Sequence, residues 1–223
     1  MTRYSSAGRT HVGMKRSNNE DAYTIRPDLS LYIVADGMGG HSSGEIASKL
    51  AVRKIVDLFE DASFDPEDIW PYEYEDGLSP QAKRLKTAIA LANEELQDYS
   101  AMHPESRGMG TTVIAALTDG ERVILSHVGD SRAYLLRKGT LEIMTMDHSW
   151  VNEQVRMGYL TDAEAQRHPF RNVITRALGT TGETASDIKE LKTEPGDLFM
   201  LCTDGLITMI SDEAIAEKLG ATN

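Results

Sequence analysis

Apolar residues recur along this chain at helical spacing in two long segments. Positions 46, 50, 51, 55 and 58 are apolar, which predicts an amphipathic helix over residues 46–59. A second apolar stripe at 85, 89, 92 and 96, with Pro80 suited to a first helical turn, predicts a helix over residues 80–99. Residues 61–78 are rich in Asp, Glu, Pro and aromatic residues without any period. They are therefore predicted to form an exposed connection between the two helices.

Short apolar runs bounded by turn residues predict the strands. They lie at residues 31–35, 112–117, 123–128, 133–137, 141–144, 187–193 and 197–202. Turn sequences at 119–120 and 129–130 indicate that the three strands between 112 and 137 follow one another in antiparallel succession. Consecutive strands with segregated helices are typical of an α+β fold built from antiparallel sheets, and we expect a single domain over residues 1–223.

Shorter elements complete the predicted order. A short helix is expected over residues 151–157, and the polar stretch 158–172 is expected to form a mobile flap with a helical turn after Thr161. Ser211 is in a position to cap a final helix that runs to Leu219. The pattern shows no internal repeat and no low-complexity linker.

Composition narrows the classes of partner. The chain has 223 residues and a formal net charge of −12, which argues against nucleic acid, because polyanion binding needs clustered Lys and Arg. No apolar run approaches the roughly 18 residues of a membrane span, and the N-terminus lacks a secretory signal. We therefore expect a cytoplasmic monomer that does not bind membranes. Cys202, the single cysteine, lies in an apolar run and is expected to be a small buried hydrophobe.

Candidate chemistry begins at Asp36 and Gly37, which follow the apolar run 31–35. An aspartate where a strand ends, followed by glycines that allow close backbone approach, suits a metal ligand, although such a pair alone is more typical of a plain turn. Asp204 and Gly205 repeat the arrangement after the apolar run 198–202. Two aspartates at the ends of separate strands are able to meet on one rim of a sheet.

Two further blocks add to these aspartates. Residues 16–21 supply Arg16, Glu20 and Asp21, and residues 129–132 supply Asp130. Carboxylates are the ligands of hard cations such as Mg²⁺ and Mn²⁺, a water between two such ions becomes a nucleophile, and a guanidinium matches phosphate oxygens. Taken without its neighbours, Arg16 is better explained as a solvated surface residue, whereas Asp130 is equally well explained as part of a hairpin turn.

Taken together, these blocks resemble the 2C-type, metal-dependent Ser/Thr protein phosphatases in their compact bacterial form. The resemblance rests on seven motifs in family order: RSNNED at 16–21, VADGMGGH at 34–41, GTT at 110–112, VGDSRAY at 128–134, DHS at 147–149, ITRALG at 174–179 and CTDGL at 202–206. Any one of these motifs is weak evidence, but seven in order are strong evidence.

The resemblance implies a four-layer αββα sandwich of two antiparallel sheets flanked by helices, with two Mn²⁺ or Mg²⁺ ions in a cleft at one end. It implies that Asp36 bridges both ions, that the Gly37 carbonyl binds one of them and that Asp204 binds the other. By the same resemblance Glu20 and Asp21 hold metal-bound waters or orient ligands, Arg16 binds the substrate phosphate, and Asp130 helps to hold a weaker third ion. Residues 158–172 become the flap beside the cleft.

The chain departs from the family pattern at two places. Met38 stands where some members carry a proton-donating histidine, so the general acid is left unassigned, with His41 and metal-bound water as the candidates. Members also usually carry an Asp-Asn pair at the start of a last strand, and no counterpart precedes Asn223; Asp212, in the cap of the final helix, is a poor substitute. We interpret the sequence as a fragment, a truncation or a variant that lacks the last strand, and expect weak metal binding.

The expected activity is hydrolysis of phosphoserine and phosphothreonine in proteins by a water bridging two ions. The expected partners are phosphorylated proteins, including a Ser/Thr kinase or its substrates. The alternative is a non-catalytic or partner-switching regulatory domain of the same fold that binds a phosphoprotein or a kinase. His127 and His148 are expected to be satisfied structural residues rather than ligands.

Overall fold

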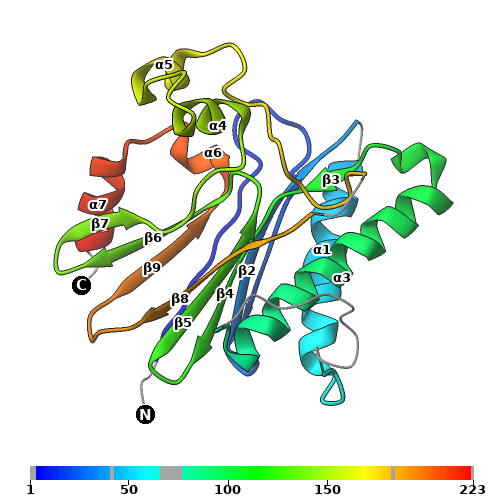
Figure 1. The fold of residues 1–223 in the computed structure, drawn as a ribbon, viewed down its shortest axis with the longest axis horizontal. Helices are drawn as coiled ribbons and strands as arrows, with labels where there is room; N and C mark the ends of the chain where they lie inside the picture. The colour runs from blue at the N-terminus through cyan, green and yellow to red at the C-terminus, as the bar shows by residue number, and fades with distance from the viewer. Residues whose placement is uncertain (1–3, 41–42, 66–76, 182–183, 222–223) are drawn as a thin grey trace.

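The computed structural model describes residues 4–40, 43–65, 77–181 and 184–221 (Figure 1). The strands are β1 (Asp21–Arg26), β2 (Leu31–Met38), β3 (Gly110–Thr111), β4 (Val113–Asp119), β5 (Arg122–Val128), β6 (Arg132–Arg137), β7 (Thr140–Ile143), β8 (Asp187–Lys192) and β9 (Leu198–Cys202). The helices are α1 (Ser43–Glu60), α3 (Pro80–Met102), a 3₁₀ turn η1 (Pro104–Ser106), α4 (Trp150–Arg156), α5 (Asp162–Arg167), α6 (Asp204–Ile207) and α7 (Asp212–Gly220). His41 and residues 66–76 of the expected connection lie outside the described residues.

The strands form two antiparallel sheets. The larger sheet has the order β1-β2-β4-β5-β8, with β3 paired to β2, and the smaller sheet has the order β7-β6-β9. The expected succession of three paired strands between 112 and 137 is wrong at its last step, because β6 pairs with β7 and β9 and not with β5. The chain instead crosses from one sheet to the other at residues 129–131. Asp130 lies in this crossing, between β5 and β6.

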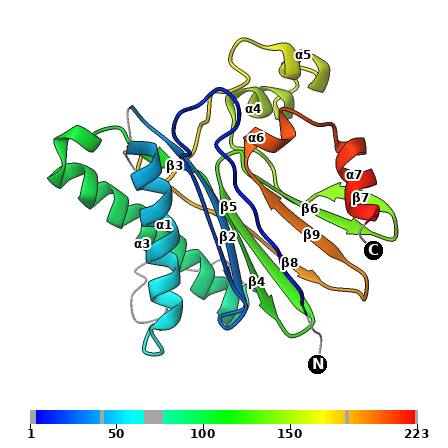
Figure 2. The same ribbon diagram turned by 180° about the vertical axis from the view of Figure 1, so that it is seen from behind.

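Side chains along the central strands point alternately to the two faces of the larger sheet, and each face is covered by a different layer of the fold. In β2, Leu31, Ile33 and Ala35 are buried against α1 and α3, which cover one face of the larger sheet (Figures 1 and 2). The intervening Tyr32 and Val34 point to the other face, where they pack with Phe199 and other residues of the smaller sheet. Helix α7 packs against β6 and β7 on the far side of the smaller sheet. The layer order is therefore the expected αββα of two antiparallel sheets.

Most predicted elements are found within a few residues of their expected ends, and three differences concern the candidate site. β1 has no counterpart among the predicted strands. β2 continues through Asp36 to Met38 instead of ending before the aspartate. Asp204 opens the short helix α6, which directly follows β9. Among the described helices, none combines the length and the apolar character needed to cross a bilayer.

Candidate metal centre

Four aspartates from four separate segments line one cavity. Asp21 and Asp36 are cross-strand partners in the β1–β2 ladder, Asp130 lies in the crossing after β5, and Asp204 begins α6. All four line a cavity of about 2530 Å³, together with Arg16 of the N-terminal segment. The charges of Asp21, Asp204 and Asp130 all act on Asp36, so the structure brings these four aspartates close together from blocks far apart in the chain.

Close backbone packing positions Gly37 and Glu20 beside these aspartates. The Gly37 amide donates a hydrogen bond of 3.0 Å to the Glu20 carbonyl. A Cβ atom on Gly37 would lie 1.9 Å from the Gly44 carbonyl oxygen, and one on Gly44 would lie 2.5 Å from Glu20 Oε1. Only glycine at both positions lets β2 and the start of α1 approach this closely. The Glu20 carboxylate is thereby held against the first turn of α1.

Burial and mutual repulsion dominate the electrostatics of the aspartates. Burial, followed by the charges of Asp21 and Asp204, raises the pKa of Asp36 to about 8. Burial and the charges of Asp204 and Asp147 raise the pKa of Asp130 to about 6. Burial also raises the pKa of Asp21. These carboxyl groups are crowded and partly buried, and they outnumber the cationic side chains around them. Such a set of oxygen ligands suits divalent cations such as Mn²⁺ or Mg²⁺.

Arg16 lies at the open side of this carboxylate group. Its Nη1 atom is 3.5 Å from Glu20 Oε2, and 65% of its side chain is exposed. The positive charge of Arg16 opposes the burial that raises the pKa of Asp21. Among the described residues, Glu20 is the ion-pair partner found for Arg16, and it engages one end of the guanidinium at a long distance. Most donors of this guanidinium therefore stay available for an oxyanion that enters the cavity.

Threonine residues form hydrogen bonds with the backbone of Asp36 and with the side chain of Asp21, a feature that the sequence analysis did not predict. The Asp36 amide donates to Thr112 Oγ1 at 3.0 Å, and the Thr112 amide and Thr111 Oγ1 each donate to the Asp36 carbonyl at 2.9 Å. Thr203 Oγ1 donates to Asp21 Oδ2 at 3.4 Å. The GTT and CTDGL motifs contain these threonines, so their membership of these motifs was the signal available in the sequence.

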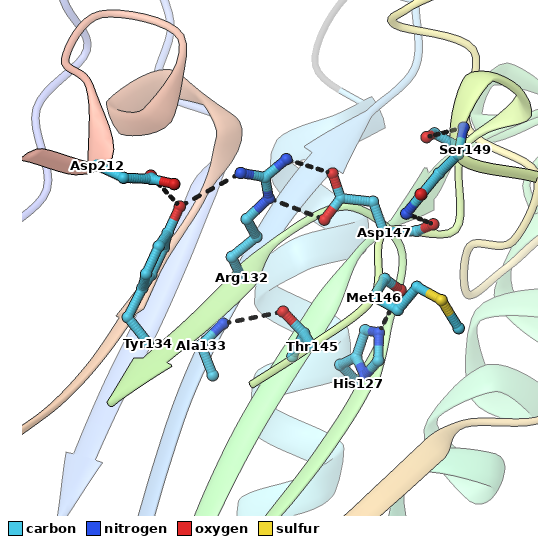
Figure 3. A network of polar contacts seen from close by, with 10 residues as sticks. His127, Arg132, Ala133, Tyr134, Thr145, Met146, Asp147, Ser149 and Asp212 are labelled. Atoms are coloured by element: carbon cyan, nitrogen blue, oxygen red, sulfur yellow. Dashed lines mark hydrogen bonds and ion pairs between the residues drawn. The ribbon is translucent and has the colours of Figure 1, made fainter. Parts of the chain in front are cut away.

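A second polar network, also missed from the sequence, borders the site (Figure 3). Arg132 donates from Nε and Nη2 to both oxygens of Asp147, at 2.9 and 2.7 Å. Arg132 Nη1 also donates to the Tyr134 hydroxyl at 3.3 Å, which in turn donates to Asp212 Oδ1 at 3.0 Å. The network ties β6 to the segment before α4 and to the first turn of α7. One carboxylate oxygen of Asp212 is therefore engaged by the Tyr134 hydroxyl.

His127, His148 and Asp187 form a separate group whose potential ligand atoms lie within 4.8 Å of one another. His127 Nε2 bonds the Met146 carbonyl at 2.9 Å, so this nitrogen carries a proton (Figure 3). His148 Nδ1 accepts from the Gly129 amide at 3.1 Å, which leaves the ring proton on Nε2, 3.4 Å from Asp187 Oδ2. With Nε2 protonated, His148 has no free lone pair to direct at a cation shared with Asp187. These hydrogen bonds agree with the structural role expected for both histidines.

Cys202 is buried in the apolar surroundings expected for it. Burial raises the pKa of its thiol to about 12, so the side chain is a neutral thiol near neutral pH. A nucleophilic role for Cys202 is therefore not supported, and the aspartates remain the chemically active group of the cavity.

Comparisons with known proteins agree with the geometry of this site. The sequence model of a family described as "Protein phosphatase 2C" matches residues 7–222. The serine/threonine phosphatase stp of Listeria monocytogenes serotype 4b is 35% identical over 216 residues, which cover 95% of this chain and 81% of that protein.

Solved structures give the same picture. The crystal structure of the Mycobacterium tuberculosis serine/threonine phosphatase PstP/Ppp superposes with a TM-score of 0.81 at 38% identity, covering 94% of this chain and 82% of that chain. The catalytic domain of PstP in complex with two manganese ions superposes with a TM-score of 0.77 at 36% identity, covering 94% of this chain and 81% of that chain.

Proposed function

Because this chain belongs to the protein phosphatase 2C family, we propose that it hydrolyses phosphoserine and phosphothreonine in proteins, using two Mn²⁺ or Mg²⁺ ions. The observation that carries the proposal is the convergence of Asp21, Asp36, Asp130 and Asp204 on one cavity that Arg16 also lines. Carboxylates that repel one another in this way are stabilised when divalent cations bind among them.

The proposed ligand roles follow from where each group lies. Asp36 and Asp204 would hold the two ions together with the Gly37 carbonyl. Asp36 and Gly37 lie in the last residues of β2, and Asp204 begins α6 close enough for its charge to raise the pKa of Asp36. Glu20 and Asp21 would orient waters around the ions, and Asp130 would contribute to a third, weaker ion. The raised pKa of Asp36 supports this assignment, since a buried carboxyl group that resists ionisation gains most from a neighbouring cation.

In the proposed mechanism, ions held by these residues would supply positive charge for the phosphoryl group and would acidify the attacking water. Arg16 binds non-reacting phosphate oxygens through its planar donors and so orients the ester at the open side of the cavity. Thr112 holds the backbone of Asp36 from behind, and this keeps the carboxylate aimed at the cavity. Met38 has no proton to give, so the side chains described at the site leave the donor to the leaving alkoxide unassigned.

The proposal extends to partners and organisation. Phosphorylated proteins are the proposed substrates, and a Ser/Thr kinase or the proteins that such a kinase modifies are the proposed partners. We propose that residues 1–223 act as one phosphatase domain, as a monomer in the cytoplasm. Relatives named as serine/threonine phosphatases support the substrate class.

The decisive experiment measures phosphate release from a phosphothreonine peptide by the purified chain with Mn²⁺ and with EDTA. Asp36→Asn is expected to abolish the Mn²⁺-dependent release, whereas Asp98→Asn, which changes an exposed aspartate of α3, is expected to keep it. Retained activity in Asp36→Asn would contradict the mechanism. Phosphopeptide binding without any turnover by the unmodified chain would instead favour the regulatory-domain alternative.

A further inference from the structure

A pair of buried hydroxyl groups connects the backbone of Asp36 to the residue next to Asp130. Thr112 Oγ1 accepts a hydrogen bond from the Asp36 amide at 3.0 Å and shares one of 2.7 Å with Ser131 Oγ. Thr112 and Ser131 are each only 1% exposed. The path from one aspartate to the other therefore runs through two side chains that solvent does not reach.

Thr112 is held in place from several directions. Its amide donates to the Asp36 carbonyl at 2.9 Å, so backbone and side chain both bind the same residue. On its other side lies Gly129, where an added Cβ would come within 2.5 Å of Thr112 Cγ2 and where φ is +106°. The crossing between the sheets consequently packs directly on the threonine.

Chemistry also favours a specific role for these hydroxyls over simple packing. A buried hydroxyl costs free energy unless it is hydrogen-bonded, and an alanine or valine would avoid that cost. Both hydroxyls are bonded here; among the described residues the buried side-chain atoms without a partner are Arg84 Nε and Ser186 Oγ. The bond between Thr112 and Ser131 joins the segment between β3 and β4, which is hydrogen-bonded to Asp36 of β2, to the sheet crossing that carries Asp130.

We propose that Thr112 and Ser131 are positioning residues that fix the separation of the Asp36 and Asp130 carboxylates, and thereby set the affinity for the ion that Asp130 holds. The inference rests on the proposed function, because it takes Asp36 and Asp130 as ligands. It adds two residues that touch neither ion nor substrate but act through the ligands. Partners of metal ligands commonly influence affinity in this way.

The test measures Mn²⁺ binding directly, by calorimetric titration of the metal-free chain. Ser131→Ala is expected to weaken the weakest Mn²⁺ binding event about tenfold. Thr112→Val, which also leaves the Asp36 amide without its partner, is expected to weaken binding more. Thr112→Ser keeps the hydroxyl and is expected to retain most of the affinity.

Matched controls separate positioning from stability. Ser126→Ala and Thr87→Val each remove another buried hydroxyl, bonded respectively to the Asp187 and Lys83 carbonyls, and are expected to leave the Mn²⁺ isotherm unchanged. An unchanged isotherm in Ser131→Ala, with a lowered melting temperature like that of Ser126→Ala, would overturn the positioning role. If Asp130→Asn also left the isotherm unchanged, Asp130 would hold no ion, and the proposed ligand set would fail together with the inference.

Discussion

Asp21 and Asp36 lie directly opposite each other in the antiparallel ladder of β1 and β2. Side chains of directly opposite residues are close neighbours, and like charges in this position destabilise a strand pair. Burial makes the repulsion stronger, because it removes the water that would screen it. The fold therefore carries an unfavourable carboxylate pair in the middle of the proposed metal site. Such an arrangement trades stability of the metal-free protein for ion binding.

A first prediction follows for Asp36→Asn. At a pKa of about 8, Asp36 is mostly protonated near neutral pH in the metal-free protein, at a free-energy cost that its burial and the charges of Asp21 and Asp204 impose. Asparagine has nearly the same shape as this neutral carboxylic acid and needs no proton, so that cost disappears. We expect the free energy of unfolding of the metal-free protein, measured by urea denaturation in EDTA near neutral pH, to rise on the order of 2 kcal/mol. Added Mn²⁺ should stabilise the unmodified protein but not the variant. A variant less stable than the parent in EDTA would argue against net repulsion at the site.

The second prediction concerns Arg16 and substrate binding. Arg16 is mostly exposed and makes one ion pair of 3.5 Å, so its removal should cost little stability. If it binds the phosphate of the substrate, Arg16→Ala should raise KM for a phosphothreonine peptide about tenfold. Lys15→Ala removes a neighbouring exposed charge and serves as the control. Equal effects of the two substitutions would reduce the role of Arg16 to general electrostatic attraction.

The third prediction concerns the ion pair of Arg132 and Asp147 in the network of Figure 3. Both side chains are largely buried, with 26% and 16% exposed, and the guanidinium meets both carboxylate oxygens. Asp147→Asn leaves a mostly buried charge with a weaker partner, and we expect a loss of about 2 kcal/mol in the free energy of unfolding. Asp28→Asn removes a similar two-point contact with Arg26 at the surface and should cost much less. Equal losses for the two variants would mean that burial does not strengthen the Arg132 pair.

Elements could be predicted from the sequence where burial of one face imposes a regular spacing on the apolar residues. The two long helices were predicted because one face of each is covered by the larger sheet, which fixes the spacing of their apolar residues. β1 escaped prediction because Asp21, Thr24 and Arg26 interrupt its apolar positions, and it lies at the edge of its sheet. Edge strands are incompletely buried and so lack a clear pattern.

The candidate ligands were predictable for a different reason. Their residue types and their sequence neighbours are enough to indicate a metal site. What the sequence does not reveal is how the ligands are held. The Gly-Asp pair at 129–130 is compatible with a hairpin and with a sheet crossing. The close approach of Gly129 to Thr112 could therefore not be predicted from the sequence. Thr112 also precedes a strand in which β-branched residues are ordinary. The role of its hydroxyl depends on Asp36 and Ser131, which are distant in the sequence and which the fold places next to it.

The last prediction uses the buried His148, which contacts the crossing segment through Gly129. Burial, and then the charges of His127 and Arg176, lower the pKa of this imidazole, against a smaller opposing effect of Asp187. Protonation of Nδ1 would also place a second donor against the Gly129 amide, which now donates to that nitrogen at 3.1 Å. The folded state therefore binds this proton less readily than the unfolded state does.

The sign of the pH dependence follows from this difference. Above the ordinary histidine pKa of about 6.5 both states are neutral, and as the pH falls below it the unfolded state gains the proton first, so stability declines. His148→Asn keeps an acceptor for the Gly129 amide but does not titrate. Between about pH 7.5 and about pH 5.5, the unmodified protein should lose roughly 1 kcal/mol more in its free energy of unfolding than the variant. Urea denaturation at both pH values measures the difference, and parallel losses in the two proteins would show that His148 is not responsible.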